Sequence, residues 1–392
     1  MISHVTRFRR LSLALPFLIF ASFLTLTAAP QEQTTTPAQS ILPGPDPPDA
    51  PAEWKSLVGI YGKSAGAQIT VFERDGRLFV TAPFLLDGDT TSKPVENYMN
   101  REFSFTTGSG HSLKLATFTN SAGEITSLLV VGTPQTQSTG SRSDNRTYQI
   151  DRPVHFARAD AGSDPAHFYH VSPAQPVAEL REKALKLSPP AEPGPFRKPN
   201  LMELVTLDSA IHLDIRYAST NNFLSTPVYT QARAFLQRPA AEALLRVLHK
   251  LQPLGYGLLI HDAYRPWYVT KIFWDATPPE GRIFVANPEE GSKHNRGCAV
   301  DLTLYDLATG KAIEMPGLYD EMSRRSFPTF PGGTSLQRWH RDLLRRAMES
   351  EGFTVNQDEW WHFDYKDWKQ YGILNVPFEK LGIGQQPADG SH

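Results

Sequence analysis

The sequence predicts an α+β fold for residues 201–385, preceded by a small all-β region, and three observations support this. Helical and strand-like patterns interleave irregularly after about residue 200. No Gly-rich phosphate-binding loop accompanies them, and this argues against a nucleotide-binding α/β fold. Short apolar runs separated by turn residues fill residues 53–170, which indicates a sandwich or barrel. The length of 392 residues allows two or three domains.

Composition excludes several classes of protein. The formal net charge of -2 gives no electrostatic reason to expect a nucleic-acid partner. Cys298 is the one cysteine in the sequence, so neither an intrachain disulfide nor a cysteine-based zinc site can form. A hydrophobic content of 40% and a charged content of 20% are ordinary for a globular protein.

The N-terminus has the pattern of a secretory signal peptide over residues 1–29. Basic Arg7, Arg9 and Arg10 precede an apolar run, and small residues follow it. An uncleaved anchor is the alternative, but the run is shorter than the roughly 20 residues of a membrane span. We therefore expect export to the periplasm or medium and no membrane span in the mature chain.

The following regions differ in composition. Residues 30–52 are rich in proline and polar residues and are expected to form a disordered linker. In residues 53–170, Asp75-Gly76 lies between two apolar runs and predicts a β-hairpin, and a similar pattern surrounds Gly123. We expect an accessory β domain there, whose partner the sequence does not reveal.

Residues 171–200 read as a helix followed by a proline-rich connection. In the region 201–385, the helix and strand patterns are clearest in four segments. A helix is expected from about 238, a short buried strand over 258–261, an alternating strand over 298–306, and a helix that ends at Gly352. We expect a small sheet with helices packed on one side, and a disordered tail at 386–392.

The stretch "GSKHNRGCAVDLTLYD" (291–306) places His294 and Asp301 beside a strand that reads as buried. Val300 and Leu302 alternate with Asp301, so the carboxylate projects from the opposite face of the strand. Polar groups without partners at a core edge cost on the order of 2–7 kcal/mol. A metal ion held by the imidazole and the carboxylate would remove that cost.

The segment "DEWWHFDY" supplies a third ligand, His362, with Glu359 three residues before it. In an ideal strand these two side chains would face opposite sides, so either the chain bends near Trp360 or Glu359 precedes the strand. Two histidines and one aspartate with a vacant position suit catalytic zinc. Glu359 would then move the proton of an attacking water.

"HDAYRP" adds Arg265, which could stabilise an oxyanion, with Asp262 placed to hold it. Structural interpretations remain open at this point. The chain has 12 histidines, so a His–Asp pair alone is weak evidence. An arginine before proline can be a capping residue, and the aromatic segment around His362 can be a core cluster.

The order and spacing of "HDAYRP", "SKHNRGCAVDLTLYD" and "EWWHFDY" resemble the D-alanyl-D-alanine dipeptidases, which are zinc peptidases of the hedgehog/DD-peptidase fold. "LVTLDSAIHLDIRYASTNNFLSTPVY" and "PGLYDEMSRRSF" agree with this. The resemblance covers roughly residues 200–380. It implies one Zn²⁺ per chain and roles for eight residues: zinc ligands His294, Asp301 and His362; general base and acid Glu359; intermediate-stabilising Arg265; substrate-binding Asp320, Ser292 and Tyr217.

The function implied is hydrolysis of D-Ala-D-Ala or a related dipeptide, linked to peptide turnover in the cell wall. Asp320 is expected to bind the free amino group of the substrate and so to restrict it to two residues. Two alternatives stay open: a D,D-carboxypeptidase or endopeptidase acting on murein peptides, and a non-catalytic protein that contains zinc and binds the wall.

Overall fold

The structure is a computed structural model, and it describes residues 41–62, 67–85, 90–99, 102–106, 112–121, 125–132, 154–159, 170–173 and 175–382. The predicted signal peptide, the first part of the linker and the tail at 386–392 lie outside these ranges. The chain divides into two units, 1–40 and 41–392. Within the described ranges, no helix is long and apolar enough to cross a membrane.

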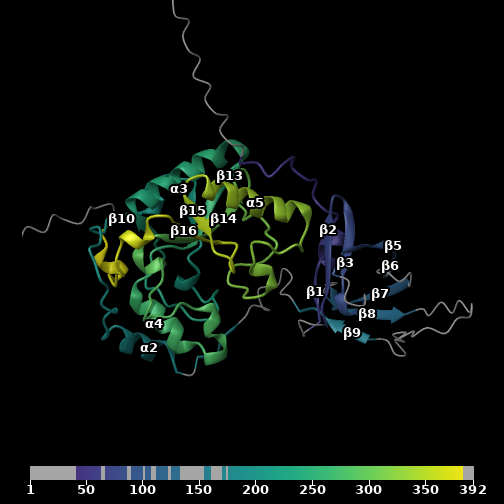
Figure 1. Ribbon diagram of the computed structural model, residues 1–392, viewed down its shortest axis with the longest axis horizontal. Coiled ribbons are helices and arrows are strands. Elements are labelled where there is room, and N and C mark those ends of the chain that lie inside the picture. The colour runs from purple at the N-terminus through teal and green to yellow at the C-terminus, as the bar shows by residue number, and fades with distance from the viewer. Residues whose placement is uncertain are drawn as a thin grey trace, which may run out of the picture. The chain divides into compact units, whose positions relative to one another are not determined.

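Five α-helices and sixteen strands make up the described part of the chain (Figure 1). The helices are α1 (Ala52–Leu57), α2 (Val177–Ala184), α3 (Arg238–Leu251), α4 (Trp267–Ala276) and α5 (Ser335–Glu349). The first nine strands are β1 (Gly59–Tyr61), β2 (Ile69–Arg74), β3 (Arg77–Thr81), β4 (Lys93–Pro94), β5 (Glu96–Met99), β6 (Glu102–Thr106), β7 (Ser112–Thr119), β8 (Ile125–Gly132) and β9 (Val154–Ala157). The others are β10 (Leu201–Glu203), β11 (Ile211–Leu213), β12 (Phe235–Gln237), β13 (Tyr256–Asp262), β14 (Ala299–Asp306), β15 (Phe353–Val355) and β16 (His362–Tyr365).

The first nine strands form two antiparallel sheets, β1-β2-β3-β4 and β5-β6-β7-β8-β9, which contribute to one apolar cluster. The hairpin expected at Asp75-Gly76 is confirmed, because Arg74 pairs with Arg77 across a two-residue turn. Both turn residues have positive φ, 51° and 72°, as the tight turns that suit twisted strands require. The second expected hairpin is the pair β7–β8.

Two details differ from the sequence-based expectation. Residues 52–57, part of which was assigned to the β pattern, form α1, which begins directly after Pro51. Residues 41–51, expected to belong to the disordered linker, instead lie against α5. Trp339 donates its indole N–H to the carbonyl of Gly44 at 3.1 Å, and Ala50 is buried. An apolar contact and a backbone partner thus hold a proline-rich segment that composition alone marks as disordered.

The site is built on a five-stranded mixed sheet with the order β11-β13-β14-β16-β15. Strands β11 and β13 are parallel, and the other neighbours are antiparallel. Helices α3 and α5 contact this sheet and each other, and they lie together on one side of it (Figure 1). Val300, Leu302 and Leu304 belong to the core shared with these helices, so Asp301 and Thr303 project from the other face.

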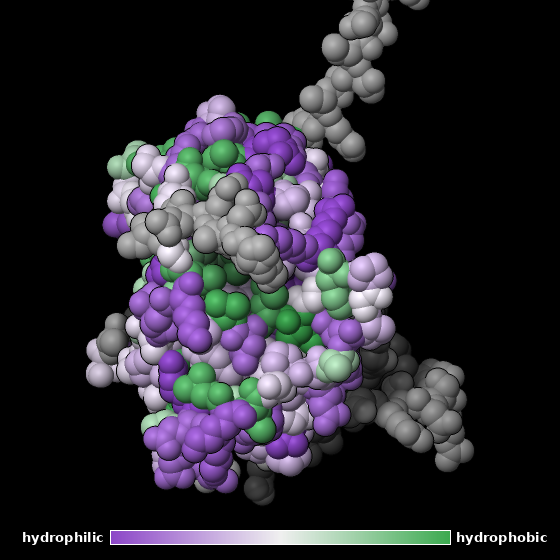
Figure 2. Space-filling model, turned by 90° about the vertical axis from the view of Figure 1, so that its left-hand side faces the viewer, coloured by the Kyte–Doolittle hydropathy of each residue, from purple (hydrophilic) through white to green (hydrophobic). Residues whose placement is uncertain are grey.

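Helix α4 begins after Pro266 and packs against α2. The segment between α2 and β10, predicted to be a proline-rich connection, contains no helix or strand. Its Glu192 accepts from Arg296 at 2.5 Å and from the backbone N–H of Ile373, so this connection is fixed to the loop that carries His294. The face turned to the viewer in Figure 2 is largely polar, with apolar side chains gathered near its middle.

Candidate metal centre and active site

Asp301 and His362 meet because β14 and β16 are antiparallel neighbours. The two residues are direct partners in the register, so their side chains emerge on the same face of the sheet. His362 is the first residue of β16 and follows a turn at Trp360 and Trp361. The strand pairing therefore places a carboxylate and an imidazole side by side, although 61 positions separate them in the sequence.

His294 reaches the same point from a short 3-10 turn, His294–Arg296, which ends at Gly297 in the left-handed conformation. Its Nδ1 lies 2.7 Å from the carbonyl oxygen of Ala263, and it donates its proton there. This bond fixes the tautomer and leaves Nε2 free to bind a metal. The imidazole is 2% exposed, so its orientation is fixed by its surroundings.

The three side chains offer ligand atoms at the corners of a small triangle. Nε2 of His294 lies 3.1 Å from Nδ1 of His362 and 3.4 Å from Oδ1 of Asp301, and the last two atoms are 3.0 Å apart. Ligands of a tetrahedral zinc with bonds of about 2.0–2.1 Å lie roughly 3.3 Å from one another. The spacing of the triangle therefore fits a tetrahedral metal ion with one open position.

Among the described residues no well-aligned hydrogen bond reaches the buried oxygen Oδ1 of Asp301, although the potential ligand atom Nδ1 of His362 lies 3.0 Å from it. A buried carboxylate oxygen without a donor is costly, and a cation bound by the same triangle would satisfy it. Burial alone would raise the pKa of Asp301, but the imidazoles of His294 and His362 outweigh it and hold that pKa well below its ordinary value. The residues that the structure describes thus contain a donor set suited to a divalent metal.

A second set of residues orients these ligands. Nε2 of His362 lies 2.9 Å from Oδ1 of Asp364, whose other oxygen pairs with Lys293 at 2.6 Å. The hydroxyl of Tyr319 donates to Oδ2 of Asp301 at 3.0 Å. The sequence analysis did not identify Asp364 or Tyr319 as partners of the ligands. Asp364 could have been found from its position two residues after His362 on the same face of a strand, but Tyr319 lies in a loop and gives no such signal.

Glu359 lies before β16, as one of the two expected arrangements required. Its Oε2 is 3.6 Å from Nδ1 of His362 and accepts a hydrogen bond from Asn356 at 3.2 Å. About a quarter of the side chain, 26%, is still exposed. Burial, and then the neighbouring carboxylate of Asp301, raise the pKa of Glu359. A carboxylate beside the metal triangle with a raised pKa is suited to accept a proton at neutral pH.

Arg265 is held beside the metal ligands by the partner that the sequence suggested. Its Nε and Nη2 lie 2.9 and 2.8 Å from Oδ2 of Asp262, and the guanidinium stacks over Tyr217 and Phe273. The other oxygen of Asp262 accepts from Tyr229 at 2.6 Å. The backbone N–H of Arg265 also bonds the carbonyl of the ligand His294. The cation is therefore fixed in position before any substrate arrives.

Asp320 is buried and has a positive φ of 56°. Tyr217 donates its hydroxyl to Oδ2 of this carboxyl at 2.9 Å. Burial, and then the carboxylates of Asp301 and Glu359, raise the pKa of Asp320 to about 8. A buried carboxyl among other carboxylates favours a cationic partner, which a substrate ammonium group would provide.

Ser292 has a local role among the contacts described. Its hydroxyl accepts from the backbone N–H of His294 at 3.2 Å, and its own N–H donates to Asn295 at 2.7 Å. These bonds shape the loop that carries the proposed ligand His294.

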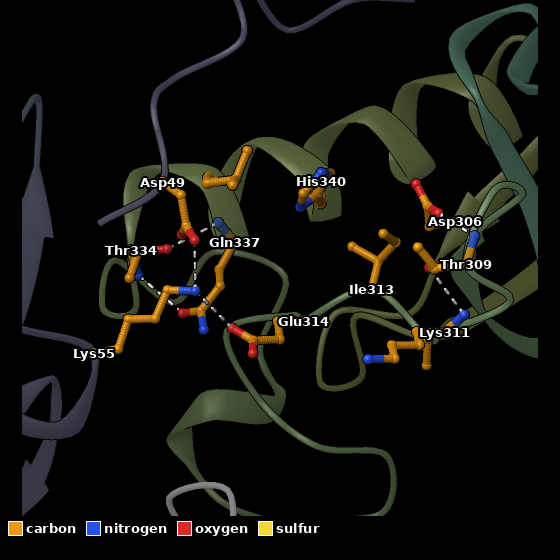
Figure 3. Close-up of a pocket in the computed structure, with 12 residues that line it drawn as sticks. Asp49, Lys55, Asp306, Thr309, Lys311, Ile313, Glu314, Thr334, Gln337 and His340 are labelled. Atoms are coloured by element: carbon orange, nitrogen blue, oxygen red, sulfur yellow. Dashed lines mark hydrogen bonds and ion pairs between the residues drawn. The ribbon is translucent and has the colours of Figure 1, made fainter. Parts of the chain in front are cut away.

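A separate cavity of about 220 Å³ lies between α5 and the turn after β14, where Thr309, Ile313 and His340 line it (Figure 3). None of the predicted site residues lines this cavity.

Two buried imidazoles, a buried carboxylate, an adjacent carboxylate with a raised pKa and a fixed arginine together define a metal-dependent hydrolase. Residues 197–379 match the model of the peptidase family M15, D-Ala-D-Ala dipeptidase. The chain is 33% identical over 178 residues to the D-alanyl-D-alanine dipeptidase of Escherichia coli strain K12, covering 45% of this chain and 91% of that protein. The enzyme of the same name from Enterococcus faecalis V583 is 35% identical over 182 residues, covering 41% and 90%.

A third relative, the D-alanyl-D-alanine dipeptidase of Streptomyces coelicolor A3(2), is 34% identical over 182 residues, covering 41% of this chain and 89% of its own length. The chain belongs to the D-Ala-D-Ala dipeptidase family of M15 metallopeptidases. The family match does not cover the N-terminal sheets, since it begins at residue 197.

Proposed function

We propose that this protein is a zinc dipeptidase that hydrolyses D-Ala-D-Ala to two molecules of alanine. The observation that carries the proposal is the triangle of His294, Asp301 and His362, whose ligand atoms lie within 4.8 Å of one another around an unsatisfied carboxylate oxygen. The M15 family and the names of the relatives support the substrate.

When bound by the triangle, zinc supplies a Lewis acid that activates water and polarises the scissile carbonyl. Glu359 accepts the proton of the attacking water at Oε2 and later delivers it to the nitrogen of the leaving amine as the C–N bond breaks. Arg265 donates hydrogen bonds to the carbonyl oxygen as negative charge develops there. Because Asp262 holds the guanidinium, this donor needs no rearrangement during the reaction.

Asp320 binds the ammonium group of the dipeptide, and Tyr217 orients the carboxylate that does so. A peptide with a further residue at its N-terminus has no ammonium group at this position. The buried carboxyl would then lack its cation, and this penalises longer substrates. Ser292 contributes by shaping the loop of His294.

The test is to assay purified protein on a panel of D,D-, L,D- and L,L-dipeptides with and without a chelator. Zinc-dependent release of alanine from D-Ala-D-Ala supports the proposal. Release of D-Ala from an N-acylated peptide would favour a murein D,D-carboxypeptidase or endopeptidase instead. Stoichiometric zinc without turnover of any dipeptide would indicate a non-catalytic protein that binds the wall.

We also infer that residues 201–385 have the hedgehog/DD-peptidase fold and that residues 53–170 form a separate accessory domain. The mixed sheet and the family match support the first statement, and the apolar cluster to which both N-terminal sheets contribute supports the second. A fragment that begins near residue 175 and folds with bound zinc would support this division of the chain.

Export is proposed from the basic and apolar pattern of residues 1–29. An exported enzyme acts on dipeptides released outside the cytoplasm, which agrees with turnover of wall peptides. Fractionation of cells that express the full-length chain checks this proposal. Finding the unprocessed protein only in the cytoplasm would refute it.

A further inference from the structure

Glu73, on β2, is a buried carboxylate that the proposed mechanism does not use. The residue as a whole is only 2% exposed. Oε2 accepts from the backbone N–H of Ser335 at 2.6 Å, and Oε1 accepts from the hydroxyl of Ser335 at 3.2 Å and from the N–H of Gly76 at 2.7 Å. Glu73 thus joins the β2–β3 hairpin to a residue 262 positions later in the chain.

Ser335 is the first residue of α5, a helix of 15 residues. N–H groups in the first turn have no partner inside the helix, and the helix dipole favours negative charge there. Thr334 and Gln337 already satisfy each other in a capping box, which Figure 3 shows. The carboxylate of Glu73 satisfies the N–H of Ser335, one of the first-turn groups that this box leaves, so the hairpin contributes to the start of the helix.

Backbone contacts reinforce this junction. The N–H of Glu73 donates to the carbonyl of Gly333 at 3.1 Å. Arg338, one turn into α5, donates to the carbonyl of Glu73 at 2.7 Å and to the carbonyls of Gly332 and Gly333 at 3.1 and 3.0 Å. A single guanidinium therefore holds β2 and the turn before α5 in one arrangement.

The turn before α5 also lies against Pro316, where the loop that carries Asp320 begins. A Cβ at Gly333 would lie 3.3 Å from Cβ of Pro316, so the two segments are in contact. Arg325 returns to the same point and donates to the carbonyl of Pro316 at 2.8 Å. Asp320 lies in the loop 316–325 that these contacts close, and its φ of 56° depends on the loop keeping its shape.

A second contact between the two regions is weak by comparison. Lys55 lies 3.6 Å from Glu314, with side chains that are 31% and 67% exposed (Figure 3). Exposed pairs of this kind contribute about 0–1 kcal/mol. Arg324 also donates to Oε1 of Gln68 at 3.4 Å, again at an exposed position, so the buried contacts of Glu73 are stronger candidates for fixing the loop.

We propose that Glu73 is a positioning residue for substrate binding: the β2–β3 hairpin holds the turn at Gly333, and this turn holds the loop in which Asp320 meets the substrate ammonium. The inference rests on the proposed role of Asp320. It gives the N-terminal sheets a part in setting affinity for the dipeptide, which the family match does not cover because it begins at residue 197.

The first test compares Glu73→Gln with Arg77→Ala in the full-length zinc enzyme. Arg77 is exposed on the same hairpin and serves as the matched control. We expect Glu73→Gln to raise KM for D-Ala-D-Ala about tenfold, as residues coupled through packed contacts do, while kcat changes less than about twofold. Arg77→Ala should leave both constants and the zinc content unchanged.

The second test asks whether the effect passes through Asp320. An inhibitor that lacks the amino group, such as propionyl-D-alanine, has nothing to offer Asp320, so Glu73→Gln should not change its inhibition constant. In a double variant with Asp320→Asn, the Glu73→Gln change should add no further increase in KM. The proposal would be overturned if Glu73→Gln raised the inhibition constant of the inhibitor as much as KM for the dipeptide. It would also be overturned if the two substitutions raised KM additively in the double variant.

Amide hydrogen exchange supplies a readout that does not need activity. We expect exchange at residues 316–326 to accelerate in Glu73→Gln and to match wild type in Arg77→Ala, with β7 and β8 unchanged in both. Unchanged exchange in this loop would refute the positioning role even if the enzyme proved inactive. Faster exchange throughout the sheets with loss of zinc would show a general role in stability and would also refute it.

Discussion

The proposed site gathers two buried carboxyl groups, Asp301 and Asp320, and one partly exposed carboxyl group, Glu359. Asp301, Asp320 and Glu359 lie around one centre, and they differ in what surrounds them. Two imidazoles keep Asp301 ionised, whereas burial and neighbouring carboxylates raise the pKa values of the other two. One environment suits a metal ligand, and the others suit a group that exchanges protons or awaits a cation.

Glu359→Ala tests the base at the scale of one residue. The side chain lies beside the triangle but is not one of its three ligands. We expect the variant to retain zinc at one ion per chain and to lose kcat by about 10²–10⁴-fold, the usual contribution of a general base. Metal analysis and steady-state kinetics measure the two quantities. Hydrolysis at close to the wild-type rate would show that another group moves the proton.

Tyr319→Phe removes the hydroxyl that donates to Oδ2 of Asp301. Partners of this kind orient metal ligands, so we expect the affinity for zinc to fall by about tenfold or more. Competition with a chromophoric chelator measures it. Tyr305→Phe is the control, because that hydroxyl contacts His212 and not a proposed ligand. Equal zinc affinity in wild type and Tyr319→Phe would contradict the assignment.

The raised pKa of Asp320 predicts a pH dependence in the metal-free protein. The folded pKa of about 8 lies above the ordinary value of 3.8, so the folded state binds an extra proton between these limits. The contribution of Asp320 to the free energy of unfolding is therefore complete below about pH 4 and is lost as the pH rises toward 8, with a slope of at most about 1.4 kcal/mol per unit.

Asp320→Asn removes this slope, and asparagine tolerates the positive φ of that position. Denaturant unfolding of both metal-free proteins between pH 5 and 8 provides the comparison. The free energy of unfolding of Asp320→Asn should increase relative to that of wild type as the pH rises. A difference that does not change with pH would mean that Asp320 is ionised throughout this range.

At the scale of elements, strand pairing and one short turn assemble the centre. The register of β14 and β16 sets Asp301 opposite His362, and the turn that ends at Gly297 delivers His294. Gly297 has a φ of 68°, and a Cβ there would lie 2.6 Å from Cδ2 of Leu201. The turn therefore depends on the lack of a side chain as well as on backbone freedom.

Gly297→Ala is compared with Gly310→Ala, because both glycines have a positive φ but only the first would meet a neighbour within 4 Å. We expect about 1–2 kcal/mol of loss from backbone conformation in both variants. Gly297→Ala should lose more stability than Gly310→Ala. It should also bind zinc more weakly, because the turn that carries His294 shifts. Thermal unfolding and zinc titration measure these effects. Equal losses and equal zinc affinities would show that the turn adapts to the methyl group.

At the scale of the whole molecule, a metal ion held by His294, Asp301 and His362 would link segments from three parts of the catalytic region. Zinc that binds only the folded state should stabilise it by roughly 4 kcal/mol at a thousandfold excess over its dissociation constant. Thermal unfolding with and without chelator tests this, and His294→Ala should show little dependence on zinc. A wild-type melting temperature that does not respond to zinc would argue against a metal in this site.

The sequence by itself determined the pieces of this site, because the chemistry is local in each motif. It placed the imidazoles, the carboxylates and the arginine on a loop and strands whose patterns can be read from residue types, and it identified the hairpin at Asp75-Gly76. It could not show the hydroxyl of Tyr319 on Asp301 or the carboxylate of Glu73 at the start of α5. These contacts join residues that no periodicity relates, and only the packing of distant segments brings their side chains within bonding distance.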